Sequence, residues 1–336
     1  MKYVLLIIIF IVSIAGIFIL YKPKYPANIP QPTISNSPLL IASMRQKTYP
    51  GSDLTIEQTL SPGNNYRQYI ASYQSDGLKI YGLLTVPSGT KPVGGWPVII
   101  FNHGYIPPAQ YRTTERYVAY VDAFARNGYI VFKSDYRGNG SSEGKAEGAY
   151  YSPSYTIDVL NAVASLKRYS EVNPDKIGMW GHSMGGNITL RDIVIDTKTV
   201  KAAVIWGGVV ASYYDLSNNW QRRVTYQPPP PELANRNNGR QQMIAMYGPP
   251  ATESAFWQSI DPTAHLADIT APIQLHTGGS DEEVPVTFSQ SLYTSLQQTG
   301  KIVEYYNYPG GDHNIASPNF EVAMQRSIAF FDKYLK

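Results

Sequence analysis

Cysteine is absent from all 336 residues of the chain. Its absence excludes disulfides, thiolate metal sites, a cysteine nucleophile and a lipidated cysteine anchor. Histidine is scarce, with five residues, so few side chains can serve as a general base. Because no two of these histidines have the His-Glu-x-x-His spacing of a zinc site, we expect no metal, and nothing in the sequence indicates a cofactor.

The chain also lacks a strong excess of charge of one sign. The formal net charge is +3, which is too close to neutral to indicate a nucleic-acid partner. Hydrophobic residues make up 43% of the chain and charged residues 16%, a balance that is typical of globular and not of disordered proteins. The length suffices for one large α/β domain or two small ones, and the sequence leaves the oligomeric state open.

A charge-free apolar segment opens the chain. Residues 3–20 are apolar apart from Tyr3 and Ser13. A run of about 18 residues is at the short end for a membrane-spanning helix and long for the core of a signal peptide. We expect residues 1–21 to be an uncleaved transmembrane anchor that leaves the following domain outside the cytoplasm. The alternative is a cleaved signal peptide and a secreted protein.

The next segment is rich in proline, with five prolines between residues 22 and 39. Proline removes backbone donors and favours extended chain, so this composition predicts a semi-rigid stalk. We expect residues 22–64 to be a linker and residues 65–336 to form the folded domain.

Strand and helix patterns alternate through the rest of the chain. Two β-rich runs joined by Asp76-Gly77 predict a hairpin. Six further strands then alternate with helical patterns, which predicts right-handed crossovers and an eight-stranded, mostly parallel sheet with helices on both faces. Residues 209–258 lose this rhythm, and we expect them to form an irregular cap over the active site. The expected strands are 66–73, 78–86, 96–101, 129–132, 176–180, 201–206, 272–276 and 301–306.

The segment Gly181-His-Ser-Met-Gly-Gly186 lies between a predicted strand and a predicted helix, residues 187–195. Strand, Gly-x-Ser-x-Gly and helix are the context of a nucleophile elbow, in which the serine occupies the tip of a sharp turn. A side chain at Gly181 or Gly185 would clash with the neighbouring strand or helix. The pattern predicts Ser183 as a nucleophile at the positive end of the helix dipole.

A serine nucleophile requires a base, and the base requires an acid that holds its tautomer. Asp281 follows the strand that ends at His276, and His313 follows the last strand. The order Ser, Asp, His along the chain is the one found in hydrolases with a nucleophile elbow. Asp281 is therefore the expected acid and His313 the expected base. The alternative acids are Glu282, Glu283 and Asp215.

Two backbone amides are expected to form the oxyanion hole, one from Met184 and one from Tyr105 in the loop after residues 96–101. At His103, beside this loop, we expect the neighbouring residue to matter more than the imidazole. The substrate pocket is expected to include the side chains of Tyr105, His182, Trp220 and Trp257.

Five motifs together resemble the α/β-hydrolase superfamily, and within it the catalytic domain of the prolyl oligopeptidase family and its dienelactone-hydrolase-like relatives. The resemblance implies that Ser183, Asp281 and His313 form a catalytic triad. It also implies that the second motif is structural and that Asp135 is not the triad acid. The motifs are Asn102–Gly104, Asp135–Gly144, Gly181–Gly186, Asp281–Pro285 and Gly311–His313.

The resemblance implies a serine hydrolase that acts through an acyl-enzyme. Oligopeptidases of the family carry a large β-propeller, for which residues 21–65 are too few, and many single-domain relatives are esterases. We therefore expect hydrolysis of carboxylic esters, with a serine peptidase acting on short peptides as the alternative. A catalytically silent binding protein on the same scaffold would be expected to lack a triad residue, and none is missing here. Acyl and alcohol specificity stay open.

Overall fold

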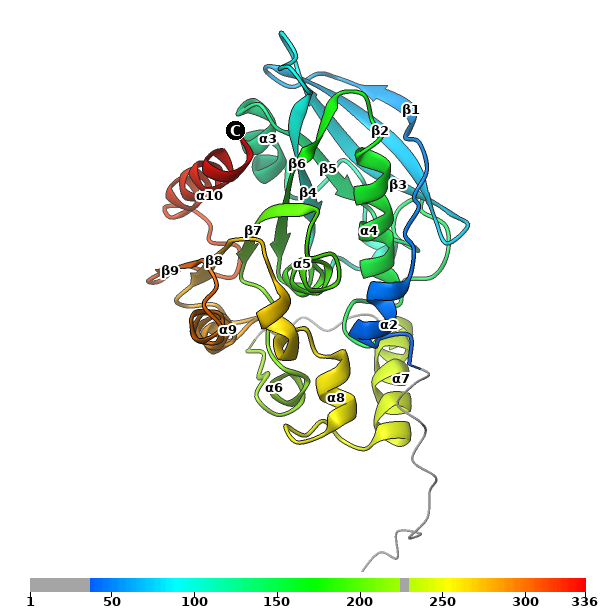
Figure 1. Cartoon of the computed structure of the whole chain (residues 1–336), viewed down its shortest axis with the longest axis vertical. Coiled ribbons are helices and arrows are strands. Elements are labelled where there is room, and N and C mark those ends of the chain that lie inside the picture. The colour runs from blue at the N-terminus through cyan, green and yellow to red at the C-terminus, as the bar shows by residue number, and fades with distance from the viewer. Residues whose placement is uncertain (1–36, 224–229) are drawn as a thin grey trace, which may run out of the picture. The chain divides into compact units, whose positions relative to one another are not determined.

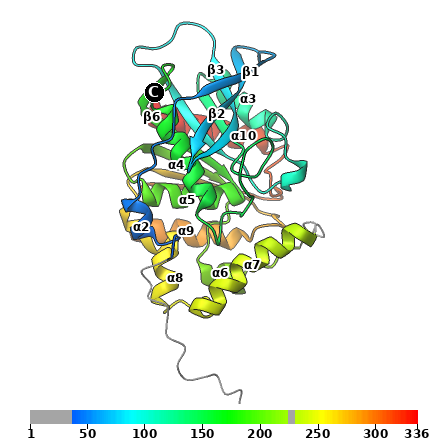
Figure 2. The same ribbon diagram turned by 90° about the vertical axis from the view of Figure 1, so that its right-hand side faces the viewer.

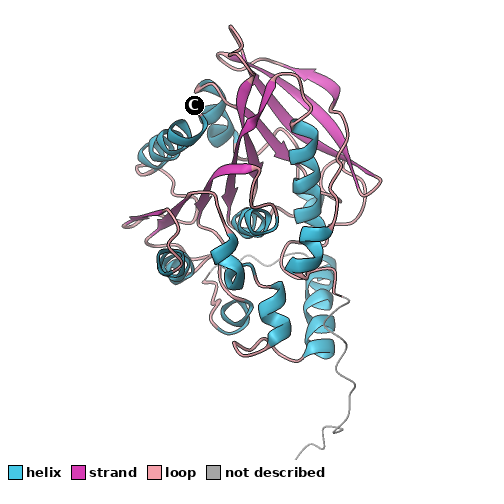
Figure 3. Cartoon of the chain, in the orientation of Figure 1, coloured by secondary structure: helices cyan, strands magenta, loops and turns pink. Residues whose placement is uncertain are grey.

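A strongly twisted sheet organises the fold. The computed structural model describes residues 37–223 and 230–336, and within them nine strands lie in the order β1-β2-β3-β5-β4-β6-β7-β8-β9 (Figures 1 and 3). The pairs among β1, β2, β3 and β5 are antiparallel, and the six strands from β5 to β9 run parallel. The predicted mostly parallel sheet is thereby confirmed. The strands are β1 Thr55–Leu60, β2 Tyr66–Ser75, β3 Leu78–Pro87, β4 Trp96–Asn102, β5 Ile130–Ser134, β6 Val172–His182, β7 Val200–Trp206, β8 Ile273–Gly278 and β9 Val303–Tyr308.

The expected total of eight strands is wrong by one, because β1 lies inside the segment expected to be a linker. Its residues are mostly exposed, so this edge strand lacks the alternation that reveals a half-buried strand. Just before it, helix α2 (Ile41–Gln46) buries Ile41 and Met44 in the domain core. Folded structure therefore begins before residue 65, whereas the expected anchor, residues 1–21, lies outside the described residues. None of the helices within residues 37–223 and 230–336 has the length and hydropathy needed to cross a membrane.

Helices cover both faces of the sheet, as the alternation of elements predicted. Helices α3 (Val118–Arg126) and α10 (Phe320–Leu335) contact one face, and α4 (Ser154–Leu166), α5 (Met184–Ile195) and α9 (Val286–Gln298) contact the other (Figures 1 and 2). The apolar residues 96–101 of β4 explain this arrangement, because successive side chains of a strand point to opposite faces. Ile99 and Phe101 pack toward α3 and α10, while Val98 and Ile100 pack toward the other layer.

The insertion between β7 and β8 is largely helical and not irregular as expected. It contains α6 (Tyr213–Asn218), α7 (Pro230–Tyr247) and α8 (Ala255–Ile260), drawn in yellow-green to yellow in Figure 2. Prolines, asparagines and a glycine in α7 lower its helix propensity, which hid the helix from the sequence pattern. The insertion has a small apolar core of its own that also includes Leu39 and Leu40. Two 3₁₀ helices, η2 (Pro108–Gln110) and η3 (Pro262–Asp268), complete the described elements.

A buried carboxyl group in α5 gives the fold a testable dependence on pH. Asp192 is fully buried, and neither of its carboxyl oxygens has a hydrogen-bond partner among the described residues. Burial raises the pKa of Asp192 well above its ordinary value, so the folded state prefers the neutral acid. Ionisation is easier in the unfolded chain, and this group therefore lowers the free energy of unfolding as pH rises above about 4.

Replacing Asp192 with asparagine removes the ionisable group and nearly preserves the side-chain volume. We expect Asp192→Asn to melt at a higher temperature than the wild type at pH 8, and to lose less stability between pH 5 and pH 8. Thermal unfolding followed by circular dichroism at the two pH values measures both effects, with the exposed Asp175→Asn as the matched control. An unchanged pH dependence in Asp192→Asn would contradict the prediction.

Candidate active site

The turn between β6 and α5 holds Ser183 in a backbone conformation that non-glycine residues rarely adopt, with φ +54° and ψ −120°. The two flanking glycines are required sterically. A Cβ at Gly181 would lie 2.4 Å from the carbonyl oxygen of Gly185, and one at Gly185 would lie 1.9 Å from that of Asn102. Ser183 thus stands at the tip of a tight turn, directly before the N-terminus of α5.

His313 and Asp281 meet at the same edge of the sheet, in the loops that follow β9 and β8. The distance from His313 Nδ1 to Asp281 Oδ2 is 2.7 Å, and both side chains are almost completely buried. The other carboxylate oxygen, Oδ1, accepts hydrogen bonds from the backbone N–H groups of Glu283 and Val284 at 2.8 and 2.9 Å. The carboxylate therefore holds the proton of the imidazole on Nδ1 and leaves Nε2 as the acceptor.

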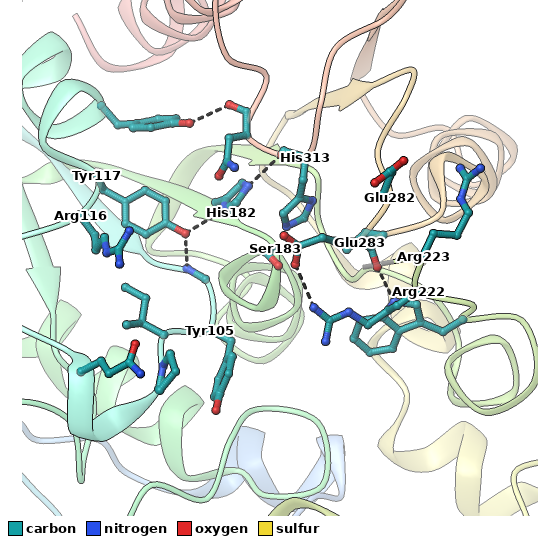
Figure 4. Close-up of a pocket in the computed structure, with 18 of the residues that line it drawn as sticks. Tyr105, Arg116, Tyr117, His182, Ser183, Arg222, Arg223, Glu282, Glu283 and His313 are labelled. Carbon is teal, nitrogen blue, oxygen red and sulfur yellow. Dashed lines mark hydrogen bonds and ion pairs between the residues drawn. The ribbon is translucent and has the colours of Figure 1, made fainter. Parts of the chain in front are cut away.

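Ser183 and His313 line one cavity of about 680 Å³ (Figure 4). Positively and negatively charged side chains border the cavity. They include the ion pair in which Arg222 Nη2 lies 3.1 Å from Glu283 Oε2. A second cavity of about 980 Å³ includes Met184. The two cavities share the side chains of Tyr105, Tyr150, Trp220 and Arg222.

Three of the four residues expected to bind substrate border the cavities, and one does not. Tyr105 and Trp220 border both cavities, and Trp220 Nε1 donates a 2.8 Å hydrogen bond to the carbonyl oxygen of Glu283. His182 borders the first cavity but is 2% exposed. Trp257 borders neither cavity, and its expected place in the pocket is wrong. It faces the core of the insertion, where Nε1 donates to the carbonyl oxygen of Gly248.

The other acidic residues considered from the sequence have different contacts. Asp215 accepts a hydrogen bond from the Ser212 hydroxyl at the start of α6. Asp135 accepts hydrogen bonds from the hydroxyls of Tyr111 and Thr113 at 2.8 and 2.6 Å. Burial raises the pKa of Asp135 to about 6. The loop after β5 is therefore anchored through Asp135 to Tyr111 and Thr113.

The sequence reasoning missed the role of the His103 side chain. Its Nδ1 lies 2.7 Å from the carbonyl oxygen of Gly104, and its ring stacks between Tyr111 and Tyr136. Burial lowers the pKa of His103 to about 3, so the ring is neutral and Nδ1–H donates to this carbonyl. Because a peptide unit is planar and trans, fixing the Gly104 carbonyl also fixes the direction of the Tyr105 N–H. The sequence feature that could have indicated this role is the pair His103-Gly104, directly after β4.

Groups of three or more histidine, aspartate or glutamate side chains suited to a metal ion are not found within the described ranges. The chemistry available at the site is that of a strained serine beside a histidine–carboxylate pair.

Comparison with known proteins gives matches across this site. Residues 116–336 match the model of the prolyl oligopeptidase family. The Bacillus subtilis protein named uncharacterized peptidase YtmA is 25% identical over 256 residues, which cover 75% of this chain and 88% of the relative. Human dipeptidyl peptidase 8 is also 25% identical over 256 residues, but these cover only 26% of its length.

Solved structures show the same fold at lower identity. The acylaminoacyl peptidase of Pyrococcus horikoshii superposes with a TM-score of 0.63 at 22% identity, over 81% of this chain and 42% of the peptidase. The acetyl xylan esterase of Paenibacillus sp. R4 gives a TM-score of 0.62 at 21% identity, over 88% of this chain and 92% of the esterase. Since the family model matches well over half of the chain and spans Ser183, Asp281 and His313, this protein belongs to the prolyl oligopeptidase family of α/β-hydrolase-fold serine hydrolases.

Proposed function

We propose that this protein hydrolyses carboxylic esters with Ser183 as nucleophile, His313 as general base and Asp281 as the acid that orients the base. One observation carries the proposal. The strained Ser183 and His313 line one cavity, and Asp281, from a third loop, is hydrogen-bonded to His313.

In the acylation step, His313 Nε2 takes the proton of the Ser183 hydroxyl while Oγ attacks the ester carbonyl. The tetrahedral intermediate collapses, the carbon–oxygen bond to the alcohol breaks, and His313 returns the proton to the leaving alkoxide. Water then attacks the acyl-enzyme with the same proton relay and releases the carboxylic acid. Asp281 stabilises the imidazolium in both steps.

The charge of the tetrahedral oxygen requires donors beside Ser183. The N–H of Met184, the first residue of α5, and the N–H of Tyr105 are the proposed pair. The helix dipole of α5 adds to their effect, since its positive end faces the same point. His103 supports the second donor by fixing the peptide between Gly104 and Tyr105.

Two findings support an ester as the substrate. The chain spans 92% of a solved acetyl xylan esterase but 42% of a solved acylaminoacyl peptidase. The two cavities that meet at Tyr105 and Trp220 also provide separate room for an acyl group and an alcohol.

A serine peptidase acting on short peptides is the second candidate, and a charged wall of the cavity favours it. Glu282 and Glu283 both line the cavity that holds Ser183. Carboxylates in this position are suited to binding the α-amino group of a peptide, which favours an aminopeptidase-like activity.

Purified residues 37–336 and a matched Ser183→Ala variant test the proposal. We expect turnover of a short-chain p-nitrophenyl ester that Ser183→Ala lacks, and labelling by a fluorophosphonate at Ser183 alone. Faster turnover of aminoacyl or prolyl p-nitroanilides than of esters would favour the peptidase. A folded protein that neither turns over these substrates nor reacts with the fluorophosphonate would refute a catalytic Ser183.

We also propose that residues 1–21 anchor the enzyme in a membrane and that the catalytic domain lies outside the cytoplasm. The charge-free run over residues 3–20 supports this placement. We expect the full-length protein to stay in the membrane fraction after a carbonate wash. Recovery of a shortened, soluble form would favour a cleaved signal peptide instead.

A further inference from the structure

A continuous chain of hydrogen bonds joins the loop after β4 to the loop that carries His313. The Gly104 N–H lies 2.9 Å from the Tyr117 hydroxyl oxygen, and this oxygen lies 2.7 Å from Nδ1 of His182. On the other side of the His182 ring, Nε2 lies 3.0 Å from the carbonyl oxygen of His313. Figure 4 shows the three contacts as dashed lines that run from Tyr117 and His182 toward His313.

The direction of every hydrogen bond in this chain follows from one constraint. A carbonyl oxygen only accepts, so His182 Nε2 must carry the proton that it donates to His313. Burial lowers the pKa of His182 to about 3, so the ring is neutral and Nδ1 is an acceptor. Tyr117 therefore donates its hydroxyl proton to Nδ1, and its oxygen accepts from the Gly104 N–H. Each group has one partner on each side and no donor faces another donor.

The backbone around Tyr117 is held in an unfavourable conformation that keeps this chain in place. Arg116 and Tyr117 have φ angles of +57° and +55°, in the left-handed region. The buried Lys133 donates to the carbonyl oxygens of Glu115 and Arg116 at 3.0 and 3.4 Å. Helix α3 begins directly after these two residues, at Val118.

Contacts of the Tyr117 ring and hydroxyl leave the side chain little freedom. The ring packs edge-on against Phe101 and Trp180, with centroids 5.5 and 6.2 Å apart. A Cβ at Gly104 would lie 2.6 Å from the Tyr117 hydroxyl, so this close approach requires glycine. The chain of hydrogen bonds from Gly104 to His313 is therefore held in one arrangement by packing, and it is not a chance contact between surface groups.

We propose that Tyr117 and His182 are positioning residues that set the separation between the oxyanion loop, residues 103–105, and the loop of the general base His313. The inference rests on the proposed function, because both loops have their roles through it. Tyr117 acts through the Gly104 amide and His182 through the His313 carbonyl, so neither needs to touch the reacting atoms. Their loss is expected to slow the chemical step more than it weakens substrate binding.

Three variants test the inference on the p-nitrophenyl ester. Tyr117→Phe removes one hydroxyl, and His182→Leu removes both ring nitrogens. In each we expect kcat to fall by roughly 10- to 100-fold while KM changes by less than about threefold. The double variant is expected to lose no more than the worse single variant, since one broken link already interrupts the chain. Tyr66→Phe is the matched control, because its hydroxyl bonds Asp122 at 2.9 Å, a partner that does not line either cavity.

His182→Gln separates positioning from general damage to the fold. Its side-chain amide can donate to the His313 carbonyl and accept from Tyr117, so we expect it to recover at least about tenfold of the kcat that His182→Leu loses. If Tyr117→Phe does not fold, the comparison of His182→Leu with His182→Gln decides the question. A kcat in His182→Leu within about twofold of the wild type, or equal losses in His182→Leu and His182→Gln, would overturn the inference. A wild-type rate no higher than that of Ser183→Ala would instead overturn the proposed function, and the inference with it.

Discussion

Asp281→Asn is expected to lower kcat by about 10⁴-fold while the fold and substrate binding persist. The reason lies in the two backbone donors that fix this side chain. The N–H groups of Glu283 and Val284 point at Oδ1, so the single carbonyl oxygen of the asparagine must occupy that position. The amide NH₂ is then turned toward His313 Nδ1, which must accept. The imidazole proton moves to Nε2, and the ring can no longer take the proton of Ser183.

Initial rates on the ester, together with thermal unfolding, measure this effect. The matched control is Asp215→Asn, because Asp215 was one of the alternative acids and bonds Ser212 and Asn219, the residues that flank α6. We expect Asp215→Asn to retain kcat within about twofold of the wild type. If Asp281→Asn retained more than a tenth of the wild-type kcat, Asp281 would not orient the base.

The elbow and the parallel sheet could be predicted because their signals are local. A strand, two obligatory glycines and a helix follow one another directly around Ser183, and alternating apolar runs define the strands on either side. The order of the acid and base loops also follows from the chain, because the ends of neighbouring parallel strands meet at one edge of the sheet. The structure brings His313 and Asp281 into contact at that edge.

The features that the sequence did not reveal depend on contacts between distant residues. Tyr117 and His182 are 65 positions apart, and no pattern near either residue indicates the other. Trp257 looked suited to a pocket by its chemistry, but the packing of α8 turns it into the core of the insertion. Strand β1 is recognised only through its pairing with β2, because its own side chains are mostly exposed.

Gly185→Ala is expected to destabilise the domain by more than about 3 kcal/mol, a large share of the roughly 5–15 kcal/mol typical of a folded domain. The added Cβ would lie 1.9 Å from the Asn102 carbonyl oxygen, 2.5 Å from its carbon and 2.8 Å from the His103 carbonyl oxygen. All three atoms belong to the backbone, so no side-chain rotation relieves the clash. Either α5 or the end of β4 must move, and both are buried between layers of the fold. Urea unfolding and the yield of soluble protein measure the loss.

Gly239→Ala is the matched control, because no atom lies close to the position of the added Cβ. A Cβ there would meet only the Tyr151 Cβ at 3.6 Å, an ordinary contact, and alanine has a higher helix propensity than glycine by about 1 kcal/mol. We therefore expect Gly239→Ala to unfold at an equal or higher urea concentration than the wild type. If Gly185→Ala unfolded at the same midpoint as Gly239→Ala, the close approach of α5 to β4 would not be needed for stability. If Gly185→Ala unfolds at a far lower urea concentration than Gly239→Ala, Gly185 is required for stability. The same glycine allows the close approach of α5 to the end of β4 that places Ser183 at the tip of the turn.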